Sequence, residues 1–290
     1  MSMNFKSFIL AIIFISILLL SWVTLYQDSR DYHRIYADDV SFDKFGTREI
    51  YPTKDGGREW YINMDNPKND TNFVITFNPN LTRQYDGSWR ISEPVVRMNV
   101  NTLPGSSPWK NVEITGYAKV VGLIPNSTNT VKDNDLSWYA RGGRHNPSTP
   151  CEASAYIGGI YDNGKVGWKK EIWFIGGYTD EKGPFAVTDS LFGRWIGWKI
   201  VIFNINNDSA VRLQSFLDNT DTNYWIKVTD ITDDGGWYAK TSDSEFFSAD
   251  CNRDKDYIIT KSGPIVTFRS DNLIWNFKNL SIREIQVDNK

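Results

Sequence analysis

Short segments that alternate apolar and polar residues fill the last third of the chain. W-I-G-W-K-I-V-I-F-N occupies 195–204, V-R-L-Q-S-F-L-D follows at 211–218, and W-N-F-K-N-L-S-I-R-E-I closes the pattern at 275–285. Asn, Asp and Gly residues separate these segments. A period of two interrupted by turn residues is typical of antiparallel strands with one buried face. The pattern therefore predicts an antiparallel sheet over 195–285.

The same alternation extends upstream, and no amphipathic helix of useful length follows residue 45. About a dozen short strands separated by turn residues predict an all-β sandwich or barrel. No linker interrupts the pattern, so we expect one β-sandwich domain over 46–290. The upstream segments lie at 59–63, 72–77, 94–100, 111–121, 136–141, 153–161 and 168–174.

The N-terminus carries an apolar segment. Lys6 precedes an uncharged run that ends at Gln27 and is long enough to cross a bilayer as a helix. A cleaved signal would have a shorter apolar region and a small-residue cleavage site. We therefore predict a membrane anchor, or an uncleaved signal, over 1–27, followed by a juxtamembrane linker over 28–45. The N-x-S/T triplets favour a domain outside the cytoplasm. They begin at Asn69, Asn80, Asn126, Asn207 and Asn279.

Composition narrows the functional classes. The net charge is −3 with a pI near 5.5, and no basic stripe suggests nucleic-acid binding. The 12 Trp and 14 Tyr residues either fill a β-sandwich core or line a groove in which sugar rings stack. Cys151 and Cys251 are expected to form one disulfide in an extracytoplasmic domain, with two buried thiols as the alternative.

The segment W-R-I-S-E-P-V-V-R-M-N-V at 89–100 offers the first candidate site residues. Ideal alternation places Glu93 and Arg97 on one face, together with positions 95 and 99, and points 96, 98 and 100 to the core. An Arg on an open sheet face can hold a carboxylate through two hydrogen bonds. Pairing of Arg97 with Glu93 or with a neighbouring strand is the alternative.

Two further segments carry polar rows. In N-V-E-I-T-G-Y-A-K at 111–119, Glu113 and Tyr117 share a face that is either ligand-facing or simply solvated. In W-Y-A-R-G-G-R-H at 138–145, ideal alternation groups Tyr139 and Arg141 with His145 and puts Arg144 on the opposite face, although a bulge at the glycine pair would change this grouping. The other histidine, at 33, falls in the linker, so His145 is the candidate base.

The segment W-K-K-E-I-W-F at 168–174 places Lys169, Glu171 and Trp173 on one face. Glu171 would need a second carboxylate nearby to act in a glycosidase, and no E-x-D-x-x-E array is present. Nucleophile-elbow, phosphate-loop and zinc-ligand spacings are also absent. No cofactor is expected, although the many Asp and Asn side chains leave a structural calcium site open.

Taken together, these segments resemble the concanavalin A-like lectin/glucanase superfamily, a jelly-roll β-sandwich, and within it the alginate-lyase-type polysaccharide lyases. S-E-P-V-V-R at 92–97 is similar to their R-[ST]-E-[LM]-R strand. R-G-G-R-H at 141–145 falls where their Q-[IV]-H strand would, with Gly143 in place of the Gln. K-S-G-P-I-V-T-F-R at 261–269 is loosely similar to their Y-F-K-A-G-x-Y strand, and 277–285 to the closing strand of the superfamily.

The resemblance implies that Arg97 would hold a uronate carboxylate and that His145 would be the base, with Tyr117 or Tyr156 as substitute proton donors. Our leading hypothesis is a membrane-anchored protein that binds polysaccharide or cell-surface glycan on a concave sheet. A polysaccharide lyase is the alternative, and an envelope protein-interaction domain is the second alternative. The expected ligand-binding residues are Glu93, Glu113, Tyr117, Tyr139, Arg141, Arg144, Lys169, Glu171 and Trp173.

Overall fold

The computed structural model describes residues 41–76, 79–124, 133–146, 148–175, 177–239 and 251–287. The predicted membrane anchor and most of the predicted linker lie outside the described residues. Within the described residues, no helix is both long enough and apolar enough to cross a membrane. Residues 41–49 belong to a separate unit, in which Phe42 and Arg48 pair in a single β-bridge, whereas the sandwich is built from residue 50 onwards.

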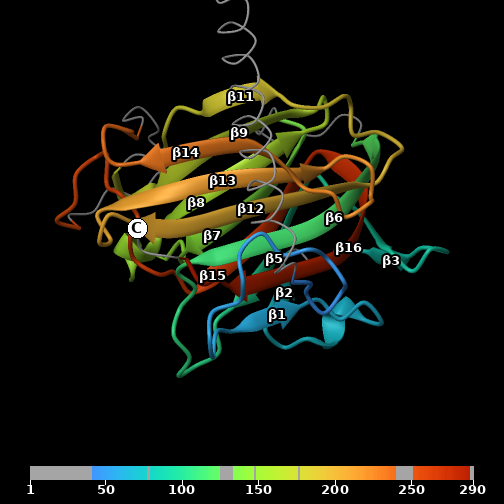
Figure 1. Cartoon of the computed structure of the whole chain (residues 1–290), viewed down its shortest axis with the longest axis horizontal. Helices are drawn as coiled ribbons and strands as arrows, with labels where there is room; N and C mark the ends of the chain where they lie inside the picture. The colour runs from blue at the N-terminus through green and yellow to red at the C-terminus, as the bar shows by residue number, and fades with distance from the viewer. Residues whose placement is uncertain are drawn as a thin grey trace, which may run out of the picture. The chain divides into compact units, whose positions relative to one another are not determined.

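The first sheet has the strand order β14-β13-β12-β6-β16-β4-β3, and β1 also pairs with β16 (Figure 1). Its pairings are antiparallel. The predicted strands at 195–204, 211–218 and 275–285 fall in this sheet. Its strands are β1 (Glu59–Tyr61), β3 (Leu81–Arg83), β4 (Trp89–Ser92), β6 (Val112–Leu123), β12 (Ile196–Ile205), β13 (Ala210–Asp218), β14 (Ile226–Asp233) and β16 (Leu273–Glu284).

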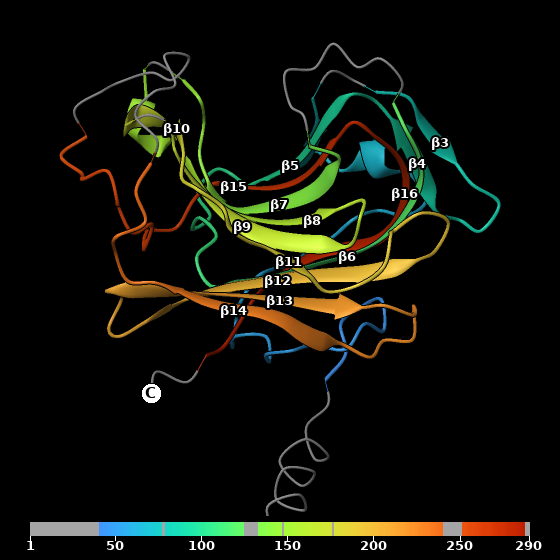
Figure 2. The same ribbon diagram turned by 90° about the horizontal axis from the view of Figure 1, so that it is seen from above.

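The second sheet has the order β10-β9-β8-β7-β15-β5-β2, and β11 also pairs with β9. Figure 2 shows it as a second layer that bends so that its ends rise on either side of its outer face. The structure thus confirms an all-β sandwich of two antiparallel sheets. The strands of this sheet are β2 (Phe73–Ile75), β5 (Val95–Asn101), β7 (Asp135–Gly142), β8 (Ser154–Tyr161), β9 (Lys165–Ile172), β10 (Gly177–Tyr178), β11 (Lys182–Ala186) and β15 (Ile265–Asp271).

Large apolar side chains fill the space between the two layers. Trp138 of β7 packs against Trp198 of β12, with ring centroids 6.5 Å apart, and against Phe268 of β15 at 5.2 Å. All three are fully buried. Gly116 of β6 faces this cluster, because a Cβ there would lie 3.2 Å from the Trp138 ring. Burial of these rings removes a large apolar area from water and holds the sheets together.

The segment 89–100 is not one strand. Trp89–Ser92 forms β4 in the first sheet, and Val95–Asn101 forms β5 in the second. Glu93 and Pro94 connect the two, since Pro cannot continue a ladder that needs its N–H. The prediction that Glu93 shares a strand face with Arg97 is therefore wrong. Within β5 the predicted alternation holds, with Val96, Met98 and Val100 buried.

Three short 3-10 turns are the helical elements of the described chain, at η1 (Pro67–Asn69), η2 (Pro150–Glu152) and η3 (Trp173–Ile175). The last two flank β8 and β9 and lie beside the connection that carries His145. They therefore belong to the surroundings of the candidate site.

Candidate functional site

A cleft of about 270 Å³ opens on the outer face of the second sheet. Its lining combines cations, a carboxylate and phenols, drawn from five strands and one connection. The residues that the argument uses are Arg97, Tyr139, His145, Glu171, Tyr178 and Arg269. The structure therefore brings together the two residues expected to carry chemistry, Arg97 and His145, although they are 48 positions apart in the chain.

Strand register explains why these side chains meet. Arg97 of β5 lies opposite Arg269 of β15, and Thr267 lies opposite both Asn99 of β5 and Tyr139 of β7. Because side chains alternate between the faces of a sheet, residues that are two apart on one strand and paired across strands share a face. Tyr178 of β10 pairs with Glu171 of β9 at the far side of this face.

The two sheet arginines of the cleft, Arg97 and Arg269, differ in the hydrogen bonds that their guanidinium groups form. Arg269 donates two hydrogen bonds to Asp271, at 2.6 and 3.0 Å, and a third to the Tyr139 hydroxyl at 3.0 Å. The Arg97 side chain forms no hydrogen bond, ion pair or ring stack within the described part of the chain. It is half-buried in the cleft wall. Arg97 therefore offers an unused guanidinium fork, the geometry that recognises a carboxylate.

His145 is oriented by two neighbours. Its Nε2 lies 3.4 Å from Glu171 Oε1, and its ring stacks on Trp173 with centroids 4.9 Å apart and planes 8° from parallel. The Glu171 carboxylate is almost fully buried, whereas the imidazole is 41% exposed. The arrangement fixes the plane of the ring and leaves one side of it open to the cleft.

The two tyrosines of the cleft are neutral phenols. Burial raises the pKa of Tyr139 above its ordinary value, and burial together with Glu171 does the same for Tyr178. Arg269 donates to the Tyr139 oxygen, so the phenolic hydrogen remains for another acceptor. Both tyrosines are therefore suited to donate a proton or a hydrogen bond rather than to accept one as a base.

A bulge in β7 decides which residues of R-G-G-R-H reach the cleft. Ile265 of β15 pairs with Gly142 and Thr267 with Tyr139, so β7 contains one extra residue, and Arg141 takes a φ of 60°. Arg141 is buried and donates to the carbonyls of Lys110 and Ile259, away from the cleft. The grouping of Arg141 with Tyr139 and His145 by ideal alternation is therefore corrected, and the bulge is the reason.

A second hollow of about 200 Å³ lies beside the first along the same sheet face. Tyr139, Tyr178 and Arg269 line both, so we treat the two as lobes of one cleft, the Arg97 lobe and the Asp135 lobe. The Asp135 lobe is lined in addition by Asp133, Asp135, Ser137, Ile157, Lys169 and Asp271.

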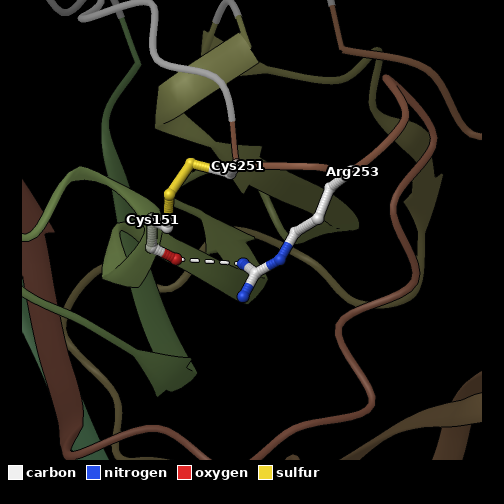
Figure 3. The surroundings of a disulfide bond; sticks show 3 residues. All are labelled: Cys151, Cys251 and Arg253. Atoms are coloured by element: carbon white, nitrogen blue, oxygen red, sulfur yellow. Dashed lines mark hydrogen bonds between the residues drawn. A yellow bond between two sulfur atoms is a disulfide. The ribbon is translucent and has the colours of Figure 1, made fainter.

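The predicted disulfide between Cys151 and Cys251 is present. It joins the connection after β7, which carries Arg144 and His145, to the segment that follows β14 (Figure 3). Arg253 Nη1 donates to the Cys151 carbonyl at 2.9 Å and reinforces this junction. Because Cys151 lies in η2, between His145 and Ser154 of the Arg97 lobe, the disulfide supports the wall of that lobe.

Several predicted site residues lie away from the cleft. Tyr156 is buried between the sheets, where its hydroxyl donates to Asp233 at 2.6 Å. Tyr117 packs in a cluster on the other side of the first sheet and donates to Asp218. Neither reaches His145. Glu93 lies in the β4–β5 connection and does not line either lobe.

Glu113 is also buried rather than solvated or ligand-facing. Its Oε1 pairs with Lys199 at 2.5 Å and Arg283 at 2.9 Å, and its Oε2 accepts the backbone N–H groups of Ile50 and Tyr51. Residues 50 and 51, which precede β1, thus cover the face of β6 that carries Glu113, the face that the sequence pattern predicted to be exposed. The interpretation of 111–119 as an exposed polar row is wrong because sequence periodicity does not show what covers a sheet.

The remaining predicted residues lie in or beside the cleft. Arg144 lines the Arg97 lobe and pairs with Glu152 through two hydrogen bonds of 2.9 Å. Lys169 lines the Asp135 lobe and pairs with Asp133 at 3.2 Å. Trp173 contacts the cleft through the His145 ring.

Several cleft residues escaped the sequence analysis, among them Arg269, Asp271, Tyr178 and Asp135. The alternation in I-V-T-F-R-S-D at 265–271 puts Thr267, Arg269 and Asp271 on one face, and this signal was available. Tyr178 lies in a two-residue strand after a 3-10 turn, where no periodicity exists to reveal it. No group of three or more His, Cys, Asp or Glu residues in the described part of the chain is arranged to hold a metal ion.

No protein-family model matches the chain, and no curated protein sequence matches it. Among solved structures, the binding domain of botulinum neurotoxin serotype D is similar at 12% identity and a TM-score of 0.39. The match covers 86% of this chain and 47% of that chain, so this protein spans about half of its length.

Two other similar structures are a protein of unknown function with a galectin-like fold from Bacillus subtilis and peanut lectin. The first has 9% identity, a TM-score of 0.40 and coverage of 80% of this chain and 100% of that one. The second has 10% identity, a TM-score of 0.37 and coverage of 80% and 99%. Likenesses at this level carry no inference about function, and the sandwich is established here by the strand pairing. The narrower resemblance to alginate-lyase-type lyases stays a prediction.

Proposed function

We propose that the cleft on the second sheet binds an acidic polysaccharide, with a uronate carboxylate on Arg97. The observation that carries the proposal is the guanidinium of Arg97, which lines a 270 Å³ cleft without a partner in the described residues. A half-buried, unpaired cation is costly in the free protein, and a bidentate carboxylate removes that cost. A charged hydrogen-bonding pair of this kind contributes about 1.5–3 kcal/mol.

The rest of the lining suits a sugar. Tyr139 and Tyr178 present phenol rings and hydroxyls, and Asn99, Thr267 and Ser154 add short polar groups. Sugars combine apolar ring faces with many hydroxyls, so a site that recognises them needs both kinds of contact. The mixture of aromatic and polar side chains on one curved sheet face supports this ligand class.

Calorimetric titration of the full chain with oligouronates tests the proposal. Arg97→Ala should weaken binding by at least about tenfold, in line with the loss of a charged hydrogen-bond pair. Arg97→Lys should fall between that variant and wild type, because it keeps the charge and loses the fork.

Arg212→Ala is the matched control, since it removes an Arg from the first sheet whose partners are Asp230 and Thr232. It should leave the affinity unchanged. If Arg97→Ala binds oligouronates as tightly as wild type, or if none of them binds wild type, the proposal is wrong.

A polysaccharide lyase is the second candidate, and the cluster of His145, Glu171, Tyr139 and Tyr178 favours it. With the carboxylate on Arg97, the imidazole removes the C5 proton, and that electron pair forms the C4–C5 double bond as the C4–O4 bond breaks. A tyrosine hydroxyl donates its proton to O4, and water returns a proton to the phenolate. Positioned acid–base groups of this kind each contribute about 10²–10⁴ in rate.

Absorbance of the unsaturated product separates the two candidates. If the lyase hypothesis holds, uronate polymers give product with wild type, and His145→Ala lowers the rate by at least about a hundredfold while binding persists. Tyr139→Phe and Tyr178→Phe identify the proton donor. Binding without product from any uronate polymer would exclude the lyase and retain the binding function.

We further propose that the domain acts outside the cytoplasm, held at a membrane by residues 1–27. The Cys151–Cys251 disulfide supports an oxidising compartment. Fractionation of cells that produce the full chain, with protease added to intact cells, tests this: the sandwich should be membrane-associated and accessible from outside.

A further inference from the structure

The two lobes of the cleft carry opposite unbalanced charges. Arg97 lines the first lobe and not the second, and Asp135 lines the second and not the first. Tyr139, Tyr178 and Arg269 separate the two groups. A ligand that extends along the cleft therefore meets the two charges one after the other.

The other charged side chains of the lobes are paired. Each cation has one acid within 3.4 Å or less, so these pairs contribute little net charge to a ligand when the His145 imidazole is protonated. The pairs are Arg144 with Glu152, His145 with Glu171, Lys169 with Asp133 and Arg269 with Asp271. This leaves Arg97 as a surplus cation in the first lobe and Asp135 as a surplus carboxyl in the second, within the described part of the chain.

Asp135 is held in an unusual position for an acid. It is only 7% exposed, and its Oδ2 accepts a hydrogen bond from the Ser137 hydroxyl. No hydrogen bond reaches its Oδ1 from the described residues, although the side chain lines the lobe. Burial, with the neighbouring Asp271 charge, raises the pKa of Asp135 to about 7. Arg269 and Lys169 act on this carboxyl from a distance, but they are paired with Asp271 and Asp133, so the ionised Asp135 has no ion pair of its own among the described residues, and a ligand cation entering the lobe would supply one.

Glycine keeps the space beside this carboxyl open. Gly159 of β8 pairs with Ser137, and a Cβ at that position would lie 3.1 Å from Ser137 Oγ and 3.6 Å from Asp135 Oδ2. The register also sets the distance between the two charges. Asp135 is two strands and two residues away from Arg97, about 12 Å between Cα atoms for ordinary sheet spacings. Neighbouring sugar rings, rather than one ring, would contact the two side chains.

From this charge distribution we infer that the ligand is a polymer in which a uronate lies next to an amino sugar with a protonated amine, the carboxylate on Arg97 and the ammonium on Asp135. This inference rests on the proposed function and names its substrate class. A homopolymer of uronates would place a carboxylate beside Asp135, where like charges repel.

Titration of the full chain with three defined oligosaccharides of equal length tests the inference. The first is a homo-oligouronate, the second alternates uronate with N-acetylated amino sugar, and the third alternates uronate with the free amine. The third should bind at least about tenfold more tightly than the other two, as expected for one buried charge pair. Asp135→Asn should abolish this preference and leave the homo-oligouronate affinity equal or higher.

The outcomes separate the inference from the proposed function. If the homo-oligouronate binds as tightly as the free-amine oligomer, or if Asp135→Asn keeps the preference, the amino-sugar inference is wrong and the uronate site on Arg97 stands. If none of the three oligomers binds, the proposed function itself fails. Asp208→Asn, which changes an exposed acid paired with Lys110, is the control and should leave all three affinities unchanged.

Discussion

The two sheets contain charged residues in strands that look alike in sequence, yet they use them differently. In the first sheet, Glu113 is enclosed by Lys199, Arg283 and two backbone N–H groups. In the second sheet, Arg97 and Asp135 line an open cleft and form no ion pair within the described residues. Charge that is satisfied within the fold stabilises it, whereas charge left over at a cleft is available to a ligand.

A second buried ion pair shows the same difference between enclosed and cleft-facing charges within a single strand. Lys170 of β9 crosses to Asp233 of β14 at 2.9 Å, and Tyr156 donates to the same carboxylate. Its neighbours along β9, Lys169 and Glu171, point to the cleft. The charged side chains of β9 thus lie on both faces of the sheet. Lys170 points into the core, where it stabilises the fold, whereas Lys169 and Glu171 line the cleft, because side chains alternate along a strand.

The largest expected effect breaks the network of the first sheet. Although burial by itself raises the pKa of the Glu113 carboxyl, Lys199 and Arg283 hold it below its ordinary value. Glu113→Ala leaves both cations buried without their acid and should lower the free energy of unfolding by about 3–5 kcal/mol. Urea denaturation measures the change.

Lys110→Ala serves as the control, because its pair with Asp208 is largely exposed. It should change the free energy of unfolding by less than about 1 kcal/mol. Equal effects of the two variants would contradict the distinction between enclosed and open charges.

The next largest effect is expected from removal of the disulfide beside the cleft of the second sheet. The double substitution Cys151→Ser and Cys251→Ser should lower the stability by about 2–4 kcal/mol, because the unfolded chain is no longer constrained by a long loop. Hydrogen exchange should increase around residues 143–153, next to His145, and remain slow in β12 and β16. Uniform acceleration in both sheets would show that the disulfide does not support the cleft in particular.

A further expected effect is a pH dependence, which is small over any single pH unit. The pKa of Asp135 is about 7 in the folded protein, above the ordinary value for Asp, so folding takes up a proton between about pH 4 and 7. This group's contribution to stability is present at low pH and is lost as pH rises through 7, with a slope of about 1.4 kcal/mol per pH unit at most.

Asp135→Asn removes that contribution, so the difference in unfolding free energy between variant and wild type should change with pH over this window and be constant above it. The groups that face Asp135 are Asp271, Arg269, Lys169 and Ser137. A difference that is independent of pH from 4 to 8 would show that the carboxyl is not perturbed.

Much of the fold could be predicted from local pattern. The alternation in 94–100 identified the buried residues of β5, and the segments at 111–121, 136–141 and 153–161 correspond to β6, β7 and β8. Arg97 and His145 were also identified, and the structure places them in one cleft. Periodicity succeeds here because one face of each strand is buried, and burial selects apolar side chains at every second position.

Other features were not predictable from pattern. The bulge at Arg141 reverses the faces of the following residues, and a positive φ at an Arg has no local sequence signal. The burial of Glu113 depends on residues 50 and 51, which are more than 60 positions away. Very short strands such as β10, with Tyr178, exist because they pair with a neighbour and not because of their own composition.

Local pattern was enough to predict antiparallel strands with one apolar face each, a disulfide between Cys151 and Cys251, and two residues of the cleft, Arg97 and His145. The tertiary structure decided which charges are neutralised and which remain open. Ion pairing and burial depend on partners from distant strands, and the register across β5, β15 and β7 is what places Arg97 and Asp135 along one cleft. A periodic pattern records how a strand meets the core, but it does not record what lies opposite its other face.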